Sequence, residues 1–492
     1  CGKTAEQLLN SIRSYDKEFA VLTRERKTIV FQQSVEPILL DPANKTDARS
    51  HEVITQIFIS LLTFDSANHI VPGMVDTFSV SKDGLIWDFK IKRGIKFHNG
   101  DVVTTQDIAN SIARVKAGPN VSFIDYIDDV AVLDDLNIRF RLKFPYLPFL
   151  ANLACGTCDI THRDLSVEKP IGAGPYRFVH WEKKKELILE VFEDFFDGRP
   201  PIDKVIIKFI QDSKEAVQRF RDGEISIMAV TPEIVKAFSP DEILSGPGLS
   251  TQYVGINVSI DTPFKNRKVR QAMNYAIDKE HFSNTIMEGQ AIPARGVFPS
   301  GMYVYNKNLS GYRCDLDKAR QLMHEAGYGS GFDSAYPFDI RESAAAIKRA
   351  EYIIKSLEKI GIKLILNPLS WNDFLERGYR GDSILCMKSW VSDNGDPDNF
   401  LYPLFHSKSF GRAGNTSFYS NREVDAMIES ARSERSSKKR QQIYQDVEQM
   451  IVGDAPWIFL SHAVDSYAVS KDIGGFRVDP FGIIRFRYLW SR

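Results

Sequence analysis

The sequence lacks the features of membrane-spanning, disulfide-rich and nucleic-acid-coating proteins. Its apolar runs, such as residues 53–62 and 451–460, fall short of the roughly 18–20 residues that a helix needs to cross a bilayer. Only 5 of its 492 residues are cysteines, so no dense disulfide framework is expected. Lys and Arg number 63 against 64 Asp and Glu, and the net charge of −1 predicts no nucleic-acid partner.

Signatures of catalysis and of metal binding are also missing. The sequence has no GxSxG, HExxH or GxxxxGK[ST] motif, and no GxGxxG opens a helix after a strand. Its 9 histidines are scattered without ligand spacing. The acidic stretch 393–398 lacks the glycine and the glutamate that complete a calcium loop. We therefore expect no enzyme activity, no metal and no cofactor.

The cysteines leave their redox state open. Besides Cys1 there are Cys155, Cys158, Cys314 and Cys386, for which three full pairings exist. Cys155 and Cys158 have CxxC spacing, but no second CxxC completes a zinc site. A local disulfide and two inert buried thiols both fit this pattern.

The chain begins with Cys1, and cleavage directly before a cysteine is what lipoprotein maturation leaves. Trimming of a leader or tag at this point by chance is the alternative. Residues 1–27 are charged and weakly periodic, which is typical of a tether between a membrane and a folded body. We expect a lipid anchor on Cys1 and an extracytoplasmic location at a membrane surface.

Helical and strand patterns alternate along the body of the chain. Helices are predicted over 50–62, after the N-cap Thr104 with Asp107 three residues on, and over 343–360. Strands are predicted over 205–210 and 362–366. At 492 residues the chain exceeds one ordinary core, so two or three domains of α/β character are expected.

Seven blocks, in order, resemble the large solute-binding proteins that deliver peptides to ABC transporters. They run from about residue 30 to 465, and the last of them resembles the dipeptide-binding subgroup. On this basis the chain is identified as a member of solute-binding protein family 5. The blocks with the clearest match are WDFKIKRGIKFHNG (87–100), GAGPYRF (172–178), FFDGRPPID (195–203), VRQAMNYAID (269–278) and SWVSDNGDPDNF (389–400).

The resemblance implies two α/β lobes around a cleft, joined by a hinge. The first lobe would hold residues 28–251 and 466–492, with an inserted subdomain at about 54–165, and the second lobe residues 252–465. Strand crossovers near Tyr253 and Ala463 would form the hinge.

Asp393 is the first candidate ligand residue. In the family that this chain resembles, the aspartate at this position pairs with the amino terminus of the peptide, and we assign that role to Asp393. It follows the strand-like stretch 385–390, at the carboxyl end, where clefts form in α/β sheets. The alternative is that Asp393 only caps a turn in the DNGDP sequence.

Arg341 is the second candidate, because the dipeptide-binding subgroup places an arginine shortly before the long helix. The fork of a guanidinium suits a bidentate carboxylate clamp, here for the carboxyl end of a short peptide. The chain departs from the subgroup after this residue, where Glu342 could instead neutralise Arg341 locally.

Aromatic and polar residues near these points are candidate contacts: Trp371, Trp390, Phe400, Tyr253 and Asn257. An aromatic residue in such a strand belongs to the core more often than it contacts a ligand.

The sequence therefore predicts a monomeric receptor that captures short peptides and presents them to an ABC permease in the membrane. Relatives carry murein-derived peptides, haem, nickel complexes or oligosaccharides on the same scaffold, so these ligands stay open as alternatives.

Overall fold

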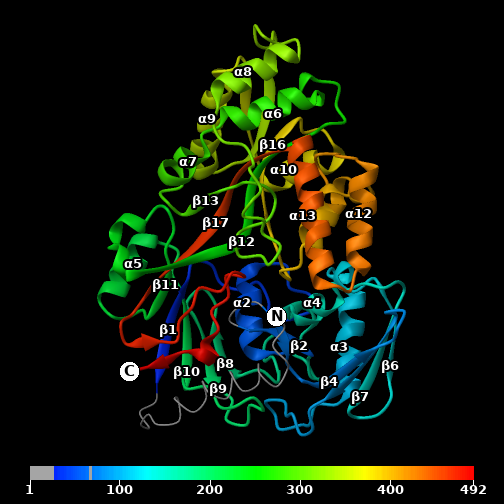
Figure 1. Cartoon of the computed structure of the whole chain (residues 1–492). Helices are drawn as coiled ribbons and strands as arrows, with labels where there is room; N and C mark the ends of the chain where they lie inside the picture. Colours follow the sequence, from blue (N-terminus) through cyan, green and yellow to red (C-terminus); the bar gives the residue numbers. More distant parts are fainter. Residues whose placement is uncertain (1–26, 66–68) are drawn as a thin grey trace.

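The computed structural model describes residues 27–65 and 69–492, and these form two lobes, one above the other in Figure 1. The long strands β12 (Ile243–Ile256) and β17 (Trp457–Val469) connect the lobes. Lobe I holds the described residues before β12 and after β17, and lobe II holds the residues between them. Cys1 and the rest of 1–26 lie outside the described residues, so the lipid anchor stays a prediction.

A single sheet of 11 strands runs through both lobes, in the order β15-β14-β16-β12-β17-β11-β1-β10-β9-β8, with β13 paired to β17. Its lobe II strands are β13 (Ala291–Pro293), β14 (Tyr336–Arg341), β15 (Leu364–Leu369) and β16 (Leu385–Val391). Its lobe I strands are β1 (Thr28–Gln33), β8 (Tyr176–Glu182), β9 (Glu186–Val191), β10 (Lys204–Phe209) and β11 (Ile227–Ala229).

The connection between the lobes is an antiparallel pair whose ladder is interrupted. The register of β12 against β17 shifts between Pro247 and Thr251. Proline has no N–H to donate, and an irregular register weakens the ladder at that point. Tyr253 lies in β12 and Ala463 in β17, so both predicted crossover residues belong to this pair. Hinge motion at the pair stays a prediction.

Lobe I is built on the parallel pair β1 and β10, which confirms the strand predicted over 205–210. The helix predicted over 50–62 is α2 (Ala48–Ile57), which ends earlier than expected. The carbonyl of Ile57 accepts the N–H of Gly174 at 2.9 Å, and the carbonyl of Ile59 accepts that of Ile160 at 3.0 Å. These carbonyls therefore bond to neighbouring segments instead of continuing the helical ladder.

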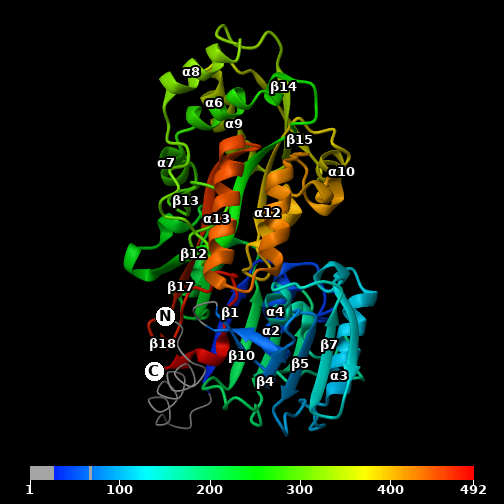
Figure 2. The same ribbon diagram turned by 45° about the vertical axis from the view of Figure 1, so that its right-hand side comes forward.

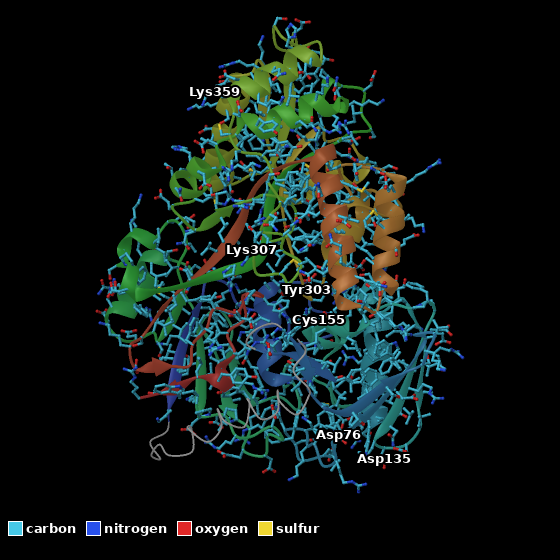
Figure 3. All side chains as sticks on the ribbon, in the orientation of Figure 1. Asp76, Asp135, Cys155, Tyr303, Lys307 and Lys359 are labelled. Atoms are coloured by element: carbon cyan, nitrogen blue, oxygen red, sulfur yellow. The ribbon has the colours of Figure 1, made fainter. Side chains whose placement is uncertain are left out.

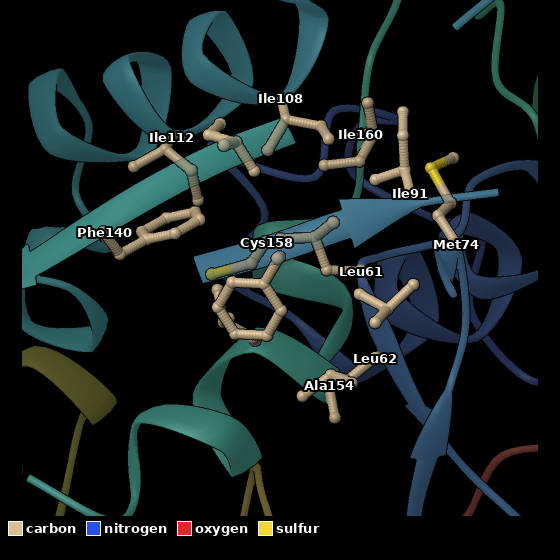
Figure 4. Close-up of a cluster of buried hydrophobic side chains, with 14 of the residues drawn as sticks. Leu61, Leu62, Met74, Ile91, Ile108, Ile112, Phe140, Ala154, Cys158 and Ile160 are labelled. Atoms are coloured by element: carbon tan, nitrogen blue, oxygen red, sulfur yellow. The ribbon is translucent and has the colours of Figure 1, made fainter. Parts of the chain in front are cut away.

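A separate antiparallel sheet forms a subdomain of lobe I, in the order β4-β5-β7-β6. Its strands are β4 (Val75–Val80), β5 (Ile86–Ile91), β6 (Ile127–Val132) and β7 (Asn137–Leu142), with helices α3 (Thr105–Ala117) and α4 (Phe149–Ala154). Thr104 and Asp107 form the predicted capping box of α3. Figure 4 shows the core of this subdomain, where Ile108 and Ile112 of α3 lie near Phe140 and Cys158.

Lobe II is rich in helices, and Figure 2 shows α12 and α13 side by side above the subdomain of lobe I. The predicted helix 343–360 is α9, capped by the side chain of Ser343. The helices are α6 (Arg267–Ala276), α7 (Lys279–His281), α8 (Leu316–Glu325), α9 (Ala344–Glu358), α10 (Trp371–Arg380), α11 (Asp398–Phe405), α12 (Arg422–Ser433) and α13 (Ser437–Asp454).

The four cysteines of the described part of the chain are free thiols. Cys155, Cys158 and Cys386 are buried, whereas Cys314 is exposed. Burial raises the pKa of Cys155 to about 11. The sequence left open whether Cys155 and Cys158 form a disulfide or are buried thiols, and in the structure they are buried thiols. No helix within residues 27–65 and 69–492 is both long and apolar enough to span a bilayer.

Cysteine alkylation tests this thiol arrangement. In native protein treated with iodoacetamide we expect Cys314 to react, and Cys155, Cys158 and Cys386 to react only after unfolding, because burial blocks access and keeps these thiols protonated. Peptide mapping by mass spectrometry measures the labelling. A disulfide-linked peptide joining Cys155 and Cys158 in a non-reduced digest would contradict the structure.

Candidate functional site

A cavity lies where lobe I meets the loop that follows β16 of lobe II. Its walls are α2 with the residues after it, the segment 154–159 and the C-terminal segment 481–488, all of lobe I. Among the described lining residues, Asp393 alone comes from lobe II. Cys155, one of the lining residues, is labelled at the junction of the lobes in Figure 3. The cavity has a water-accessible volume of about 50 Å³, which is room for a few water molecules.

The loop that carries Asp393 is held by its neighbours. Gly395 N–H bonds to the Ser392 hydroxyl at 2.9 Å, and Asp396 N–H bonds to the Asn394 side chain at 2.9 Å. Across residues 27–65 and 69–492, no hydrogen bond or ion pair holds the Asp393 carboxylate itself. Asp393 is therefore not the residue that caps this turn, and its side chain is left to face the cavity.

The electrostatic surroundings of Asp393 are those of a cleft. Asp393 is an exposed residue, and it is one of the residues that line the cavity. The surrounding protein still removes much of the bulk water, and this desolvation raises the pKa of Asp393 above its usual value. The positive charge of Lys45 acts in the opposite direction. A cation that binds beside the Asp393 carboxylate would lower the free energy through electrostatic attraction.

The two arginines of the cavity wall already have carboxylate partners. Arg485 Nε lies 2.6 Å from an oxygen of Asp479, and Arg487 Nη2 lies 2.7 Å from an oxygen of Asp197. Their charges are thus largely compensated inside the protein. A ligand anion would have to compete with these pairs, whereas a ligand cation meets an unpaired carboxylate at Asp393.

Sequence reasoning missed a second carboxylate on this wall, that of Asp159. It lies after the short turn of 3₁₀ helix Gly156–Cys158, and only 5% of its surface is exposed. Burial raises the pKa of Asp159 to about 8. Nothing in the sequence marks Asp159 as a ligand residue, because an aspartate beside a CxxC pair is also common in ordinary polar loops.

Arg341 and Trp371 lie together at the carboxyl ends of β14 and β15, outside the cavity wall. The guanidinium carbon of Arg341 is 5.1 Å from the centre of the Trp371 ring, and 51% of Trp371 is exposed. No ion pair joins Arg341 to Glu342 or to any other carboxylate in the described part of the chain. The guanidinium is therefore free to meet an anion.

The other predicted contact residues have protein partners. Tyr253 is buried and stacks on Trp457 with ring centres 3.4 Å apart. Asn257 is buried and donates to the carbonyl of Gly381 at 2.9 Å. Both are core residues in this structure, and neither lines the cavity.

Phe400 and Trp390 support the Asp393 loop rather than facing the cavity. Phe400 is fully buried, in edge contact with Phe298. Trp390 is partly buried, and its indole N–H donates to the carbonyl of Asn399 at 2.9 Å. These two rings hold the end of β16 and the start of α11.

The lobes touch beside the cavity through polar contacts. The Tyr146 hydroxyl of lobe I donates to Asp398 of lobe II at 2.9 Å, and Asn394 donates to Asn152 at 2.5 Å. Arg432 lies 3.3 Å from Asp398. Burial raises the pKa of Asp398 to about 6, and Arg432 opposes that shift. Through these contacts the segment 394–398 of lobe II is held against residues 146–152 of lobe I.

Known proteins share this architecture along most of the chain. Residues 69–412 match the family described as Bacterial extracellular solute-binding proteins, family 5 Middle. The heme-binding protein A of Haemophilus influenzae is 28% identical over 505 residues, covering 93% of this chain and 91% of the relative. The dipeptide-binding protein of Escherichia coli is 25% identical and covers 93% of each chain.

Two solved structures extend the similarity to the fold. The periplasmic binding protein DppA of Helicobacter pylori, in complex with the peptide STSA, has a TM-score of 0.78 and 27% identity, over 94% of this chain and 98% of that one. HbpA2 of Haemophilus parasuis has a TM-score of 0.86 and 25% identity, over 94% and 100%. The resemblance inferred from the sequence blocks is confirmed: the chain belongs to the bacterial extracellular solute-binding proteins of family 5.

Proposed function

We propose that this protein is the peptide-capturing component of an ABC importer. It binds short peptides outside the cytoplasm, in the cavity between its lobes, and presents them to a membrane permease. The observation that carries the proposal is the carboxylate of Asp393, which comes from lobe II and faces a lobe I cavity without a partner among the described residues. Support also comes from the peptide-bound relative of Helicobacter pylori, which is described as ABC transporter-associated.

The α-ammonium of a peptide is the natural partner for Asp393. A charge-assisted hydrogen bond is roughly twice as strong as a neutral one, and it strengthens further when water leaves the closing cleft. The cavity now has room for water alone, so a peptide enters when the lobes separate and is enclosed when they close around it in a wider arrangement than the present one. Ligand and closure are then coupled, because a bound peptide contacts both lobes only in the closed form.

The remaining candidate residues take supporting roles in this proposal. Arg341 holds the carboxyl end of the peptide, and the exposed ring of Trp371 stacked on it borders a side-chain pocket. Trp390, Tyr253, Asn257 and Phe400 brace the strands that present Asp393. The receptor acts as a monomer, and lipid on Cys1 would keep it near the permease.

Haem is the main rival ligand, because the heme-binding protein A of Haemophilus influenzae is among the relatives. Haem carries ionised propionates, which an unpaired carboxylate repels and which the paired Arg485 and Arg487 are poorly placed to bind. No group of three or more potential metal ligands occurs within the described ranges, which gives a bare metal ion no site. Murein-derived peptides, nickel complexes and oligosaccharides are further outcomes of the ligand tests.

Replacing Asp393 by asparagine tests the ammonium partner. We expect Asp393→Asn to weaken the binding of dipeptides by about 3–5 kcal/mol, because an ammonium would be enclosed without a counter-charge. Isothermal titration calorimetry of ligand-free protein with Ala-Ala measures the change. Asp333→Asn, an exposed lobe II carboxylate, is the matched control and should bind as wild type does. An Asp393→Asn variant that binds Ala-Ala unchanged would contradict the assignment.

Arg341 predicts a dependence on the carboxyl end of the peptide. We expect an amidated dipeptide to bind about 10-fold more weakly than the free acid, because a charged hydrogen bond is lost. Arg341→Ala should remove this difference, and Arg313→Ala, an exposed control, should keep it. Equal affinities of the amide and the acid for wild-type protein would show that Arg341 is not a carboxylate clamp.

The contact of Tyr146 with Asp398 predicts that closure contributes to affinity. Tyr146→Phe removes one hydrogen bond between the lobes and should weaken peptide binding by about 1 kcal/mol, without touching the cavity wall. Small-angle scattering should detect a larger open fraction in the unliganded variant. Tyr328→Phe, in the outer part of lobe II, serves as control. Unchanged affinity and unchanged scattering would mean that this contact does not hold the lobes together.

A further inference from the structure

Asp159 lines the same cavity as Asp393, and its buried carboxylate has no hydrogen-bond or ion-pair partner among the described residues. Its Oδ2 atom is inaccessible to solvent and accepts no hydrogen bond. No ion pair reaches this side chain from any residue in 27–65 or 69–492. A buried polar group without a partner is costly, and such groups in native proteins mark strain, catalysis or a missing ligand. Asp159 lines the cavity, so a bound ligand can supply the missing partner.

The two carboxyl groups of the cavity wall outnumber the single positive charge of a peptide amino terminus, so one of them either keeps its proton or binds a second cation. Asp393 and Asp159 contribute two carboxyl groups, and the α-ammonium of the peptide pairs with one of them. Lys45 acts on both through its field but forms no ion pair with either in the described structure. Arg485 and Arg487 are held by Asp479 and Asp197. One carboxyl group is left for a second cation.

We propose that Asp159 binds a second positive charge of the ligand, so that the preferred substrates are short peptides whose first residue has a basic side chain. This inference rests on the proposed function and names its substrate class. The two carboxyl groups line one small cavity, so the charges that they bind must lie close together. The side chain of the first residue is the part of a peptide that stays near its α-ammonium, and lysine, ornithine and arginine carry the cation there.

The titration of Asp159 gives the preference a characteristic pH dependence. Burial raises the pKa of Asp159 to about 8, so at neutral pH the empty site holds a proton. A basic side chain favours the ionised form and displaces that proton, whereas a neutral side chain leaves it in place. The preference for basic peptides should therefore rise as pH increases toward and past 8. The other titratable or charged groups near Asp159 and the cavity are Lys45, His51, Cys155, Cys158, Asp393, Arg485, Arg487 and Tyr488.

Titration of these neighbouring groups does not produce the pH dependence that is expected from Asp159. Burial lowers the pKa of His51 well below its usual value, so this ring is neutral throughout the range. Burial raises the pKa values of the Cys155 and Cys158 thiols, which therefore stay protonated at neutral pH. Loss of charge on the peptide α-ammonium at high pH weakens the binding of Lys-Ala at least as much as that of Ala-Ala, because the side-chain ammonium of Lys-Ala lowers the pKa of its α-ammonium, so this effect opposes the expected rise in preference.

The test compares Lys-Ala with Ala-Ala by calorimetry at pH 6.5 and 8.5. We expect wild-type protein to prefer Lys-Ala by about 10-fold or more at pH 8.5, and by less at pH 6.5, because a charge-assisted bond is gained when Asp159 ionises. Asp159→Asn should lose the preference for Lys-Ala at both pH values. Asp164→Asn, whose side chain in the same segment is 79% exposed, should retain it.

The outcomes separate this inference from the proposed function. Equal affinities for Lys-Ala and Ala-Ala at both pH values would overturn the role of Asp159 and leave peptide binding intact. Absence of binding by either peptide would overturn the proposed function itself. Circular dichroism checks that Asp159→Asn folds.

If that variant does not fold, wild-type protein still decides the matter. Titration at pH 7 in phosphate and in Tris buffer counts the protons released, and Lys-Ala should release about one more proton than Ala-Ala. The same proton count for both peptides would refute the second cation site.

Discussion

An ionised carboxyl group that is withdrawn from bulk water needs a positive partner, and this requirement shapes the cavity between the lobes. Asp393 and Asp159 are both desolvated, and neither has a partner in the part of the chain that is described. Arg485 and Arg487 of the cavity wall are not available as partners, because they form ion pairs with Asp479 and Asp197. In the proposed function a cationic ligand meets this requirement, and because Asp393 belongs to lobe II and Asp159 to lobe I, that ligand contacts both lobes.

The fold makes closure of the lobes feasible without breaking the protein into independent parts. One sheet passes through both lobes, and the long strands β12 and β17 cross between them. Their shifted register near Pro247 is a local weak point within an otherwise continuous ladder. Direct contacts such as Tyr146 with Asp398 add a second, separable connection. In the proposed function, opening would break these polar contacts and the contacts of Phe481 with lobe II, and would bend the irregular strand pair.

Much of the local structure could be predicted from the sequence, because its determinants lie within one helix or strand. The capping box of Thr104 and Asp107, the apolar stripe of α9 and the alternation in β10 are of this kind. The end of α2 could not be predicted, since the carbonyl of Ile57 bonds to Gly174, far away in the chain. Asp393 was found through its resemblance to a family, and local pattern alone favoured a turn cap.

The sequence by itself determined the α/β character and the family, because periodicity, caps and collinear blocks are written in consecutive residues. Only the tertiary structure decided which polar groups have partners. It assigned Tyr253, Asn257 and Phe400 to the core, left Arg341 beside Trp371, and brought Asp159 to the wall that Asp393 faces. The reason is physical: whether a charge is satisfied depends on groups distant in the chain, which meet when the lobes pack.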